Sequence, residues 1–404
     1  MPPLLGREPD MTSIRTTERV MLSAAFTLAA SNSVVFALMG NLQDEFGFAD
    51  WGLGIIAAAG FLTSFLMQVL VSPFADRGHT RRLLIIGTVL AVIGNTVFAT
   101  GSSLIQFVIG RAFAGAASGT FMPPAYATVA SLAPEGKSER LGAMRGVDLA
   151  GFVTGPVIGG LLVGPLGLRW PFVLFAGSAL VAMAIVATQP IPTLPPNESG
   201  QRLAFGLLRH RSVLVPVMFL VALALPVGIY DSLWDRFLTD IGASDAVVGL
   251  SLAVYAIPFV ALSRFGGRLA DRRGRITVCF TGLLVVAPLT ALYGWFAVPA
   301  IPIAIGVVES CAQAAASPAA AGMLAAGAPP GRASAAQGLA GACNQLVAAT
   351  VALVATWGYG QTTPKVLFTI AGALLLAIGI AARYLHQTSV GKVQDSRSTI
   401  MANP

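Results

Sequence analysis

The sequence carries little charge for its length. Charged residues make up 11% of 404 positions, whereas apolar residues make up 55%. A soluble chain of this size needs a largely polar surface, so this balance excludes an ordinary soluble protein. The net charge of +7 would suggest a nucleic-acid partner for a soluble domain, but here the basic residues lie in short segments between apolar runs. Anionic lipid headgroups and membrane topology explain that placement better, so we expect a lipid bilayer as partner and no nucleic acid.

Cysteine is scarce, and the usual enzyme motifs are missing. Cys279, Cys311 and Cys343 lie far apart inside apolar runs, where they are interpreted as small hydrophobic residues and not as a disulfide frame or metal site. The sequence contains no Walker loop, dinucleotide fingerprint, HExxH or nucleophile elbow. We therefore predict no enzyme, no cofactor and no metal. Any active process has to draw on an ion gradient or on the gradient of a substrate.

Long apolar runs fill most of the chain. A run of about 20 residues crosses a bilayer as a helix, and Gly and Pro are tolerated inside it. Charge, Pro or Gly bounds twelve such runs, which predict an all-α membrane protein with twelve transmembrane helices. The predicted spans lie near residues 20–42, 51–74, 83–101, 105–132, 141–164, 170–189, 212–238, 246–269, 276–296, 299–325, 335–358 and 364–384.

A Pro-rich and then basic segment separates the sixth run from the seventh, and it is interpreted as a linker. Lys and Arg are concentrated on one side of the predicted spans, whereas the other side keeps only Arg169, Arg236 and Lys365. Basic loops stay in the cytoplasm, so we expect a protein of the inner or plasma membrane with both termini on the cytoplasmic side. The predicted parts are a cytoplasmic arm (1–18), a six-helix half (19–189), the linker (190–211), a second six-helix half (212–385) and a disordered tail (386–404).

A charged turn occurs twice, 195 positions apart and each time between two apolar runs. The full copy is Gly267-Arg268-Leu269-Ala270-Asp271-Arg272-Arg273-Gly274-Arg275, and the weaker copy is Ser72-Pro73-Phe74-Ala75-Asp76-Arg77-Gly78-His79-Thr80. The full copy resembles the loop signature of the major facilitator superfamily, the twelve-helix secondary transporters. The weaker copy has Ser72 and His79 where that family usually has Gly.

The resemblance implies two pseudo-symmetric six-helix halves that rock around a site at the middle of the membrane. It also implies that the signature residues tie the cytoplasmic helix ends of the halves together, and an Asp there can cap an exposed helix N-terminus. The residues concerned are Asp76, Arg77, Gly267, Asp271, Arg272, Gly274 and Arg275.

The fifth run is rich in glycine. Gly151, Gly155 and Gly159 share one helical face, which lets a neighbouring helix approach closely, and Pro156 bends the helix. Ordinary packing of small residues is the alternative. With Gly142 before them and Gly160 after them, these residues resemble the antiporter signature of the drug/proton exporters within the family.

Three ionisable residues inside apolar runs are candidates for proton coupling. Arg111 begins a pattern with Gly115 and Gly119 that resembles the third signature of the family, in which the arginine is associated with proton movement. It lies roughly 10 Å below the outer surface, and the alternative is an arginine that snorkels outward. Asp148 lies on the glycine face, or else pairs with Arg145 or Arg140.

Glu309 is the third candidate, about ten residues into its run, which places it near the middle of the membrane. Gln313 and Ser317 continue its face, and such a polar stripe is expected to line a cavity. The alternative is a protonated Glu309 tied to a neighbouring helix by hydrogen bonds. Desolvation at this depth disfavours the charged carboxylate, which is what a coupling site needs.

Two further acids, Asp231 and Asp235, lie with Tyr230 and Trp234 near the outer end of the seventh run. Because Arg236 is adjacent, we interpret this segment as an interfacial aromatic belt with a solvated ion pair and not as a substrate site.

Other polar and aromatic residues at helical spacing predict an apolar substrate cavity with few polar anchors. Aromatic residues in such positions also pack against other helices or lipid, so each residue alone is weak evidence for a cavity. The set suits lipophilic compounds better than sugars or phosphates. It comprises Asn32, Phe36, Phe61, Phe65, Gln68, Tyr255, Phe259, Gln313, Asn344 and Gln345.

Together these features predict a monomeric secondary active transporter that exports small, mostly apolar molecules by proton antiport, as multidrug resistance exporters do. The first run has no acid between Val20 and Leu42, unlike some multidrug members, which weakens a preference for cationic drugs. One alternative is a facilitator or proton symporter for a single metabolite. Another is a transporter-like membrane sensor or scaffold.

Overall fold

The computed structural model describes residues 11–48, 51–132, 135–192 and 204–402, and the regular structure in these ranges is entirely helical. Long helices and short 3₁₀ helices alternate with brief connections. In chain order they are α1 (Met11–Phe46), α2 (Trp51–Leu70), η1 (Ser72–Arg77), α3 (Thr80–Thr100), α4 (Leu104–Ser131), α5 (Lys137–Leu166), α6 (Trp170–Thr188), η2 (Ala204–Arg209), α7 (Arg211–Asp240), α8 (Asp245–Arg273), α9 (Arg275–Leu292), η3 (Tyr293–Trp295), α10 (Ala300–Gly327), α11 (Ala333–Gln361) and α12 (Pro364–Ala402).

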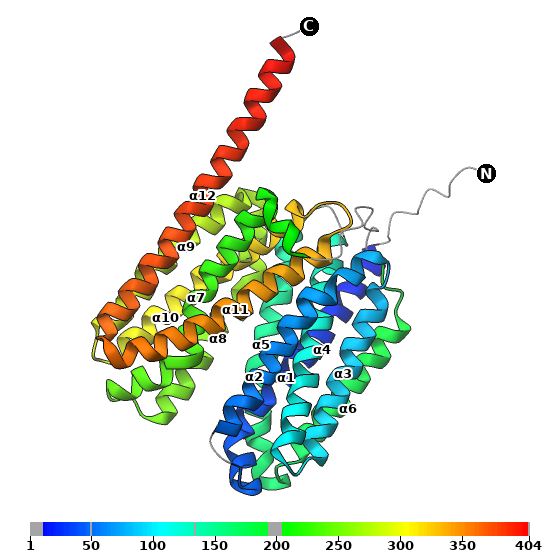
Figure 1. The fold of residues 1–404 in the computed structure, drawn as a ribbon, viewed down its shortest axis with the longest axis vertical. Coiled ribbons are helices and arrows are strands. Elements are labelled where there is room, and N and C mark those ends of the chain that lie inside the picture. Colours follow the sequence, from blue (N-terminus) through cyan, green and yellow to red (C-terminus); the bar gives the residue numbers. More distant parts are fainter. Residues whose placement is uncertain (1–10, 49–50, 133–134, 193–203, 403–404) are drawn as a thin grey trace, which may run out of the picture.

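The twelve long helices form two bundles, α1–α6 and α7–α12 (Figure 1). Each bundle has its own buried apolar core. One core of the first bundle gathers around Phe121 and Met144, and one of the second gathers around Phe219 and Leu283. The predicted fold class, an all-α membrane protein with two six-helix halves, is therefore confirmed.

Ten helical segments among the described residues are long and apolar enough to cross a membrane. The two long helices outside that set, α8 and α11, contact the opposite half, α8 against α5 and α11 against α2. Both bury polar side chains, such as Ser263 on α8 and Gln337 on α11. Large apolar side chains including Leu161, Ile257 and Ile370 remain exposed, as expected where helices face lipid.

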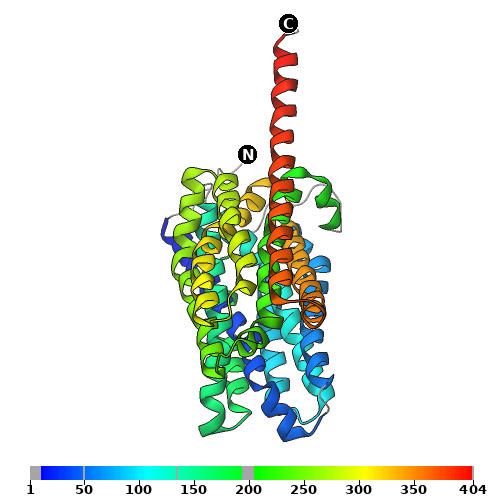
Figure 2. The ribbon, with the colours of Figure 1, turned by 90° about the vertical axis from the view of Figure 1, so that its left-hand side faces the viewer.

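Two helices extend beyond their predicted ends. The first helix begins at Met11, inside the segment predicted as an arm. The last helix continues to Ala402 and projects from the bundle (Figure 2). It thus includes residues 386–402 of the segment 386–404, for which the sequence predicts a disordered tail. Adding a turn to an existing helix is far easier than nucleating one, and residues 386–402 contain no proline to stop it. Of the predicted linker, residues 193–203 lie outside the described part.

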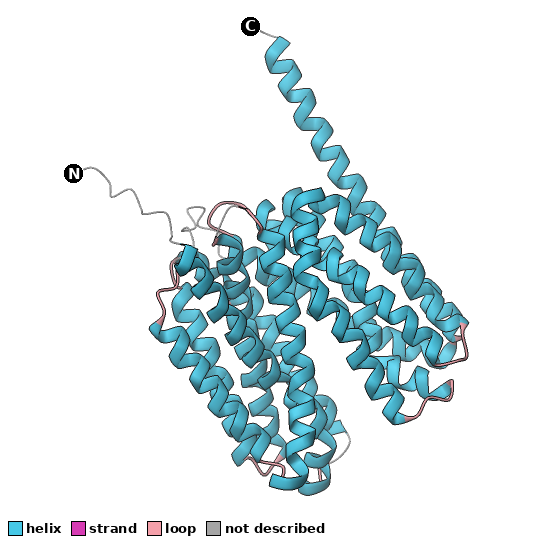
Figure 3. Cartoon of the chain, turned by 180° about the vertical axis from the view of Figure 1, so that it is seen from behind, coloured by secondary structure: helices cyan, strands magenta, loops and turns pink. Residues whose placement is uncertain are grey.

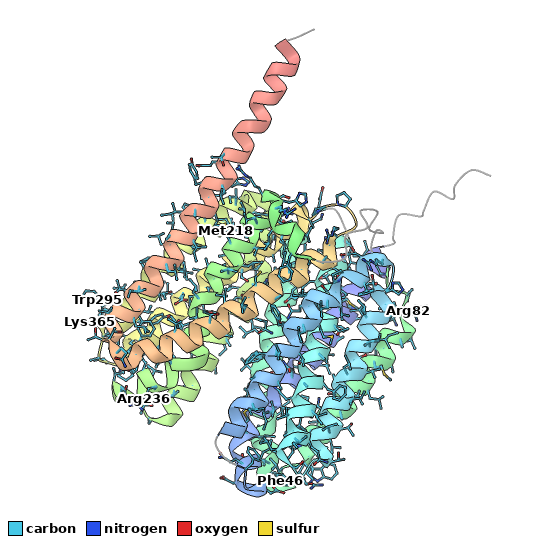
Figure 4. All side chains as sticks on the ribbon, viewed as in Figure 1. Phe46, Arg82, Met218, Arg236, Trp295 and Lys365 are labelled. Carbon is cyan, nitrogen blue, oxygen red and sulfur yellow. The ribbon has the colours of Figure 1, made fainter. Side chains whose placement is uncertain are left out.

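The helices are connected at two opposite faces of the molecule. The termini face is where α1 begins, and it carries the α2–α3, α4–α5, α8–α9 and α10–α11 connections. The far face carries the α1–α2, α3–α4, α5–α6, α7–α8, α9–α10 and α11–α12 connections. The bundles meet at the termini face and diverge toward the far face (Figure 3), and Phe46 and Arg236 mark their separate far ends (Figure 4). Two small apolar clusters join the halves, one that includes Ala75 and Ala333 and one that includes Leu141 and Ala321.

Candidate functional site

The two signature aspartates lie at the termini face, and each binds the start of a helix in the opposite half. The Asp76 carboxylate accepts hydrogen bonds from the backbone N–H groups of Ser334 and Ala335, at 2.8 Å each. The Asp271 carboxylate accepts one from the backbone N–H of Glu139, at 3.1 Å. The first N–H groups of a helix have no partner inside it, and a negative charge there is favourable. Both contacts therefore hold the halves together at this face.

The second copy of the turn adds ion pairs that the first copy lacks among the described residues. Arg275 donates to Asp271 at 2.8 Å and to the Ser138 hydroxyl at 2.9 Å. Glu139 accepts from Arg268 at 2.8 Å and from Arg264 at 3.2 Å. These arginines are about half exposed, so their ion pairs with Glu139 contribute less than the buried contacts.

The remaining signature arginines point elsewhere. Arg77 lies over the Phe74 ring of its own turn, 5.1 Å from the ring centroid, and Arg272 is exposed. The turn requires one residue with a positive φ angle. This residue is Gly274 (φ 93°) in the second copy and Gly78 (φ 84°) in the first. The glycine that His79 replaces is thus supplied one position earlier.

The serine that replaces glycine at position 72 is accommodated by its partner helix. In the second half, a side chain at Gly267 would overlap the backbone of Ser138 on α5. In the first half, Ser72 is fully buried, and Gly338 on α11 leaves the space that its hydroxyl fills. Each of the two contacts between the halves thus has one glycine. In one contact it is Gly267 of the signature turn, and in the other it is Gly338 of the partner helix.

The glycine face of α5 packs directly on α1. A Cβ atom at Gly151 would overlap the carbonyl oxygen of Phe26, and one at Gly155 would overlap that of Ala30. Gly159 contacts Val34 on the same helix. Gly142, nearer the termini face, instead packs against Ser263 on α8, in the other half.

Two members of the α5 signature do not share this contact. No atom lies within 4 Å of a Cβ built at Gly160, and Pro156 is half-buried. Close helix approach therefore explains Gly151, Gly155 and Gly159, but it does not explain Gly160.

Arg111 is buried inside the first half, with 2% of its surface exposed, so it does not snorkel outward. Its Nη1 donates to the backbone oxygen of Asn32 at 2.6 Å and to the side-chain oxygen of Asn32 at 2.7 Å. Its guanidinium lies over the Phe36 ring, 4.6 Å from the centroid. Asn32 and Phe36, two residues of α1 that were predicted to line the cavity, thus hold Arg111 of α4 in place. The Nε atom is buried without a hydrogen-bond partner among the described residues.

Glu309 is fully buried inside the second half, where three side chains donate to its carboxylate. Oε2 accepts from the Tyr293 hydroxyl at 2.5 Å and from the Tyr230 hydroxyl at 2.9 Å. Oε1 accepts from the Gln313 amide at 3.1 Å. The stripe predicted to line a cavity is buried in this state, since Gln313 is 3% and Ser317 6% exposed.

The structure corrects the interpretation of Tyr230 and Trp234 as an interfacial belt. Tyr230 binds Glu309, and Trp234 is 4% exposed, with its indole N–H donating to the Ser251 hydroxyl at 2.9 Å. The side chains of Asp231 and Asp235 lie outside the described part. Tyr293, which the sequence analysis did not single out, is a phenol inside an apolar run, and such a hydroxyl needs a buried partner.

Asp148 is half-buried between α5 and α4, where the Tyr126 hydroxyl donates to its carboxylate at 3.4 Å. Arg145 lies over the Tyr126 ring, 5.7 Å from the centroid, and Arg140 donates to the backbone oxygens of Val129 and Glu135. Tyr126 also packs against the apolar cluster that joins the halves. Asp148 therefore lies close to the junction of the bundles.

The other predicted cavity residues do not form one wall. Gln345 on α11 and Gln68 on α2 both donate to the Ser64 hydroxyl, at 3.2 and 3.0 Å, which links the halves by hydrogen bonds. The remaining members range from exposed to buried. Phe61 and Asn344 are exposed, Phe65 and Tyr255 are half-buried, and Phe259 is buried.

Comparison with known proteins gives the family and the fold. The family model described as Major Facilitator Superfamily matches residues 21–235 and 228–399. An uncharacterised MFS-type transporter of Methanocaldococcus jannaschii is 23% identical over 279 residues, which is 66% of this chain and 72% of that protein. The quinolone resistance protein NorA of Staphylococcus aureus is 26% identical over 206 residues, which is 48% of this chain and about half (52%) of NorA.

Among solved structures, the E. coli fucose:proton symporter FucP in its outward conformation has a similar fold. The TM-score is 0.77 at 17% identity, and the match covers 92% of this chain and 99% of FucP. At that identity the likeness speaks for the fold alone.

Proposed function

Because the chain belongs to the major facilitator superfamily, and is thus a secondary transporter, we propose that it exports small, mostly apolar compounds in exchange for protons. The main support for proton coupling is Glu309, whose carboxylate is fully buried within a membrane-spanning helix. Among the described residues it has no cationic partner within 4.0 Å, so no fixed charge holds it ionised.

The surroundings of Glu309 suit both of its protonation states. Burial away from water disfavours the charged carboxylate. Three hydrogen-bond donors, from Tyr230, Tyr293 and Gln313, favour it. A coupling site has to exchange its proton during the cycle, and opposing influences of this kind keep both forms within reach.

Antiport requires that proton and substrate favour different states of the protein. We assign the termini face to the cytoplasm, since the basic connections lie there. With that assignment, the contacts of Asp76 and Asp271 close the cytoplasmic face, and we take the divergence of the bundles at the other face as the state open to the outside. In this state Glu309 takes up a proton and substrate leaves. After the halves rock, the proton is released inside and substrate binds.

The proposed substrate class rests on exposed aromatic side chains of the first half and on the burial of ionisable side chains in both halves. Phe61 and Phe152 are 43% and 40% exposed, and Phe152 packs on Phe36, with the ring centroids 5.9 Å apart. The polar groups Arg111 and Glu309 are buried and already hydrogen-bonded. Such surroundings favour apolar compounds. The partial similarity to NorA, a quinolone resistance protein, and the glycine face of α5 support export over uptake.

Reconstitution of the Glu309→Gln variant in proteoliposomes tests this proposal. Gln resembles the protonated side chain but cannot exchange a proton, so export driven by a pH gradient is lost while substrate exchange at equal pH is kept. Asp148→Asn, at the half-buried acid that is the next coupling candidate, is the comparison, and it keeps pH-driven export if Glu309 alone carries the proton. If Glu309→Gln still concentrates substrate against its gradient, Glu309 is structural and the coupling site lies elsewhere.

The same vesicles decide between export and the alternative of symport. Antiport moves protons and substrate in opposite directions, whereas a proton symporter moves them together. A pH-sensitive dye trapped in the lumen shows the direction of proton movement when substrate is added. Alkalinisation of the lumen while substrate enters it identifies antiport, and acidification identifies symport.

A further inference from the structure

The Glu309 carboxylate has no direct opening to solvent. Glu309 itself is 0% exposed, and two of its three donors, Tyr293 and Gln313, are 1% and 3% exposed. The third donor, Tyr230, is half-buried. Among these donors, Tyr230 is thus the residue that is partly exposed, and its hydroxyl contacts the carboxylate directly.

Aromatic rings hold Tyr230 in this position. Its ring centroid lies 4.8 Å from that of Trp234, 5.1 Å from that of Tyr255 and 5.7 Å from that of Tyr293. Its hydroxyl bonds both the Tyr293 hydroxyl and Glu309. The phenol is thus fixed against the carboxylate by rings on several sides.

The titratable groups around Glu309 come from two helices and one short 3₁₀ segment. Tyr230 is on α7, Tyr255 is on α8 and Tyr293 begins η3 after α9, whereas Gln313 on α10 does not titrate. No Lys, Arg or His among the described residues forms an ion pair with Glu309. The described neighbours of the carboxylate are therefore uncharged hydroxyl and amide groups.

We propose that Tyr230 relays protons between the open side of the protein and Glu309. This rests on the proposed role of Glu309 as the coupling carboxylate. In the loading step, the phenol oxygen accepts a proton from a hydronium ion as its own O–H proton passes to Oε2 of Glu309. One O–H bond forms and one breaks at the phenol, which ends neutral, and the hydronium becomes water. Release runs the same step backwards.

Tyr293 provides a contrast built into the same site. It makes the shorter hydrogen bond to the same carboxylate oxygen, 2.5 Å against 2.9 Å, yet it is 1% exposed and faces the interior of the half. It orients the carboxylate but has no access to water. Loss of either hydroxyl removes one donor from Glu309, and only loss of the Tyr230 hydroxyl interrupts the relay.

The test compares Tyr230→Phe and Tyr293→Phe in the purified full-length protein, reconstituted with one lipophilic compound that the wild type exports. Two rates are measured for each variant, export driven by an imposed pH gradient and substrate exchange at equal pH. A positioned proton-transfer group contributes a factor of about 100 or more, so we expect Tyr230→Phe to lower pH-driven export at least about tenfold. Exchange stays within about twofold of wild type, because it needs no proton transfer.

Tyr293→Phe removes a donor that orients the carboxylate but leaves the relay, so it is expected to lower the pH-driven rate clearly less than Tyr230→Phe does. Equal loss of that rate in both variants overturns the relay, as does an unchanged rate in Tyr230→Phe. Loss of exchange in Tyr230→Phe also overturns it, because the residue is then structural. Glu309→Gln separates the two proposals. If it keeps pH-driven export, the coupling role of Glu309 fails and the relay fails with it. If only Tyr230→Phe keeps it, the relay alone fails.

Discussion

Asp76 and Asp271 are equivalent residues of the two halves, and each caps a helix of the opposite half. Asp76 is 1% exposed and uses both carboxylate oxygens, whereas Asp271 offers one oxygen to the backbone N–H of Glu139 and the other to Arg275. The Asp76 contact is therefore the more completely buried of the two. The halves separate at this face only if both sets of hydrogen bonds break.

Asp76→Asn and Asp271→Asn are expected to destabilise the state that is closed at the termini face. A hydrogen bond to a charged group contributes about 1.5–3 kcal/mol, which corresponds to a population shift of tenfold or more. The maximal transport rate falls while the substrate KM stays within about twofold, because neither residue lies near the buried site. We expect the larger effect for Asp76→Asn.

Spin labels at Asp44 and Thr239, two exposed positions near the far ends of α1 and α7, report this equilibrium. Either substitution shortens the mean distance between the labels as the far face closes. Arg272→Gln, at an exposed signature residue without a described contact, serves as the control and leaves the distribution unchanged. A lower affinity with an unaltered distribution would speak against a role in switching.

The glycines of α5 are expected to differ in their tolerance of a side chain. Gly155→Ala places a methyl group against the carbonyl oxygen of Ala30, whereas Gly160→Ala meets no atom within 4 Å. Overpacking of a tight contact costs about 1–3 kcal/mol, so Gly155→Ala loses most transport and Gly160→Ala keeps it. Gly155→Leu is more severe, and Val157→Leu is mild because Val157 is 54% exposed. Equal export by Gly155→Ala and Gly160→Ala, at equal amounts in the membrane, would refute close packing as the reason for Gly155.

Asn32 is expected to be important through Arg111. Asn32→Ala removes one acceptor from a buried guanidinium, which costs about 1–3 kcal/mol and lowers the temperature at which the detergent-solubilised protein loses its monodisperse elution peak. Arg111→Lys loses the planar contact with Phe36 as well and is expected to be the less stable variant. An Asn32→Ala protein with wild-type stability would show that water replaces the missing acceptor.

A hydrogen bond from Tyr359 and the neighbouring Arg236 lower the pKa of Asp240, at the far end of α7, below its usual 3.8. Because the folded pKa is depressed, the stabilisation is present above pH 3.8 and is lost as pH falls through the lower folded value. The pair is exposed, so Tyr359→Phe costs less than about 1 kcal/mol. Its melting temperature lies below that of the wild type near neutral pH, and the gap closes in acid. A gap that persists at low pH would assign the effect to packing.

The sequence by itself determined the membrane class, the helix count and the internal repeat. Apolar runs of bilayer length can form only helices in lipid, so their number gives the architecture whatever their neighbours are. That Asp76 and Asp271 can cap a helix was predicted from the sequence, but the helices they cap, α11 and α5, belong to the opposite halves, and only the packing of the bundles brings them there. The glycine face of α5 was also predicted from the sequence, because helical periodicity places Gly151, Gly155 and Gly159 on one side of a helix.

Tertiary structure decided which of these side chains meet. Tyr230, Tyr293 and Glu309 come from three different parts of the second half, and no spacing along the chain shows that their hydroxyl and carboxyl groups converge. Trp234 follows Tyr230 by one helical turn and was interpreted as facing the membrane surface, yet it is buried, because burial depends on the helices packed around it. Likewise, Arg111 is an intramembrane charge by sequence, but only the approach of α1 gives it Asn32 as a partner.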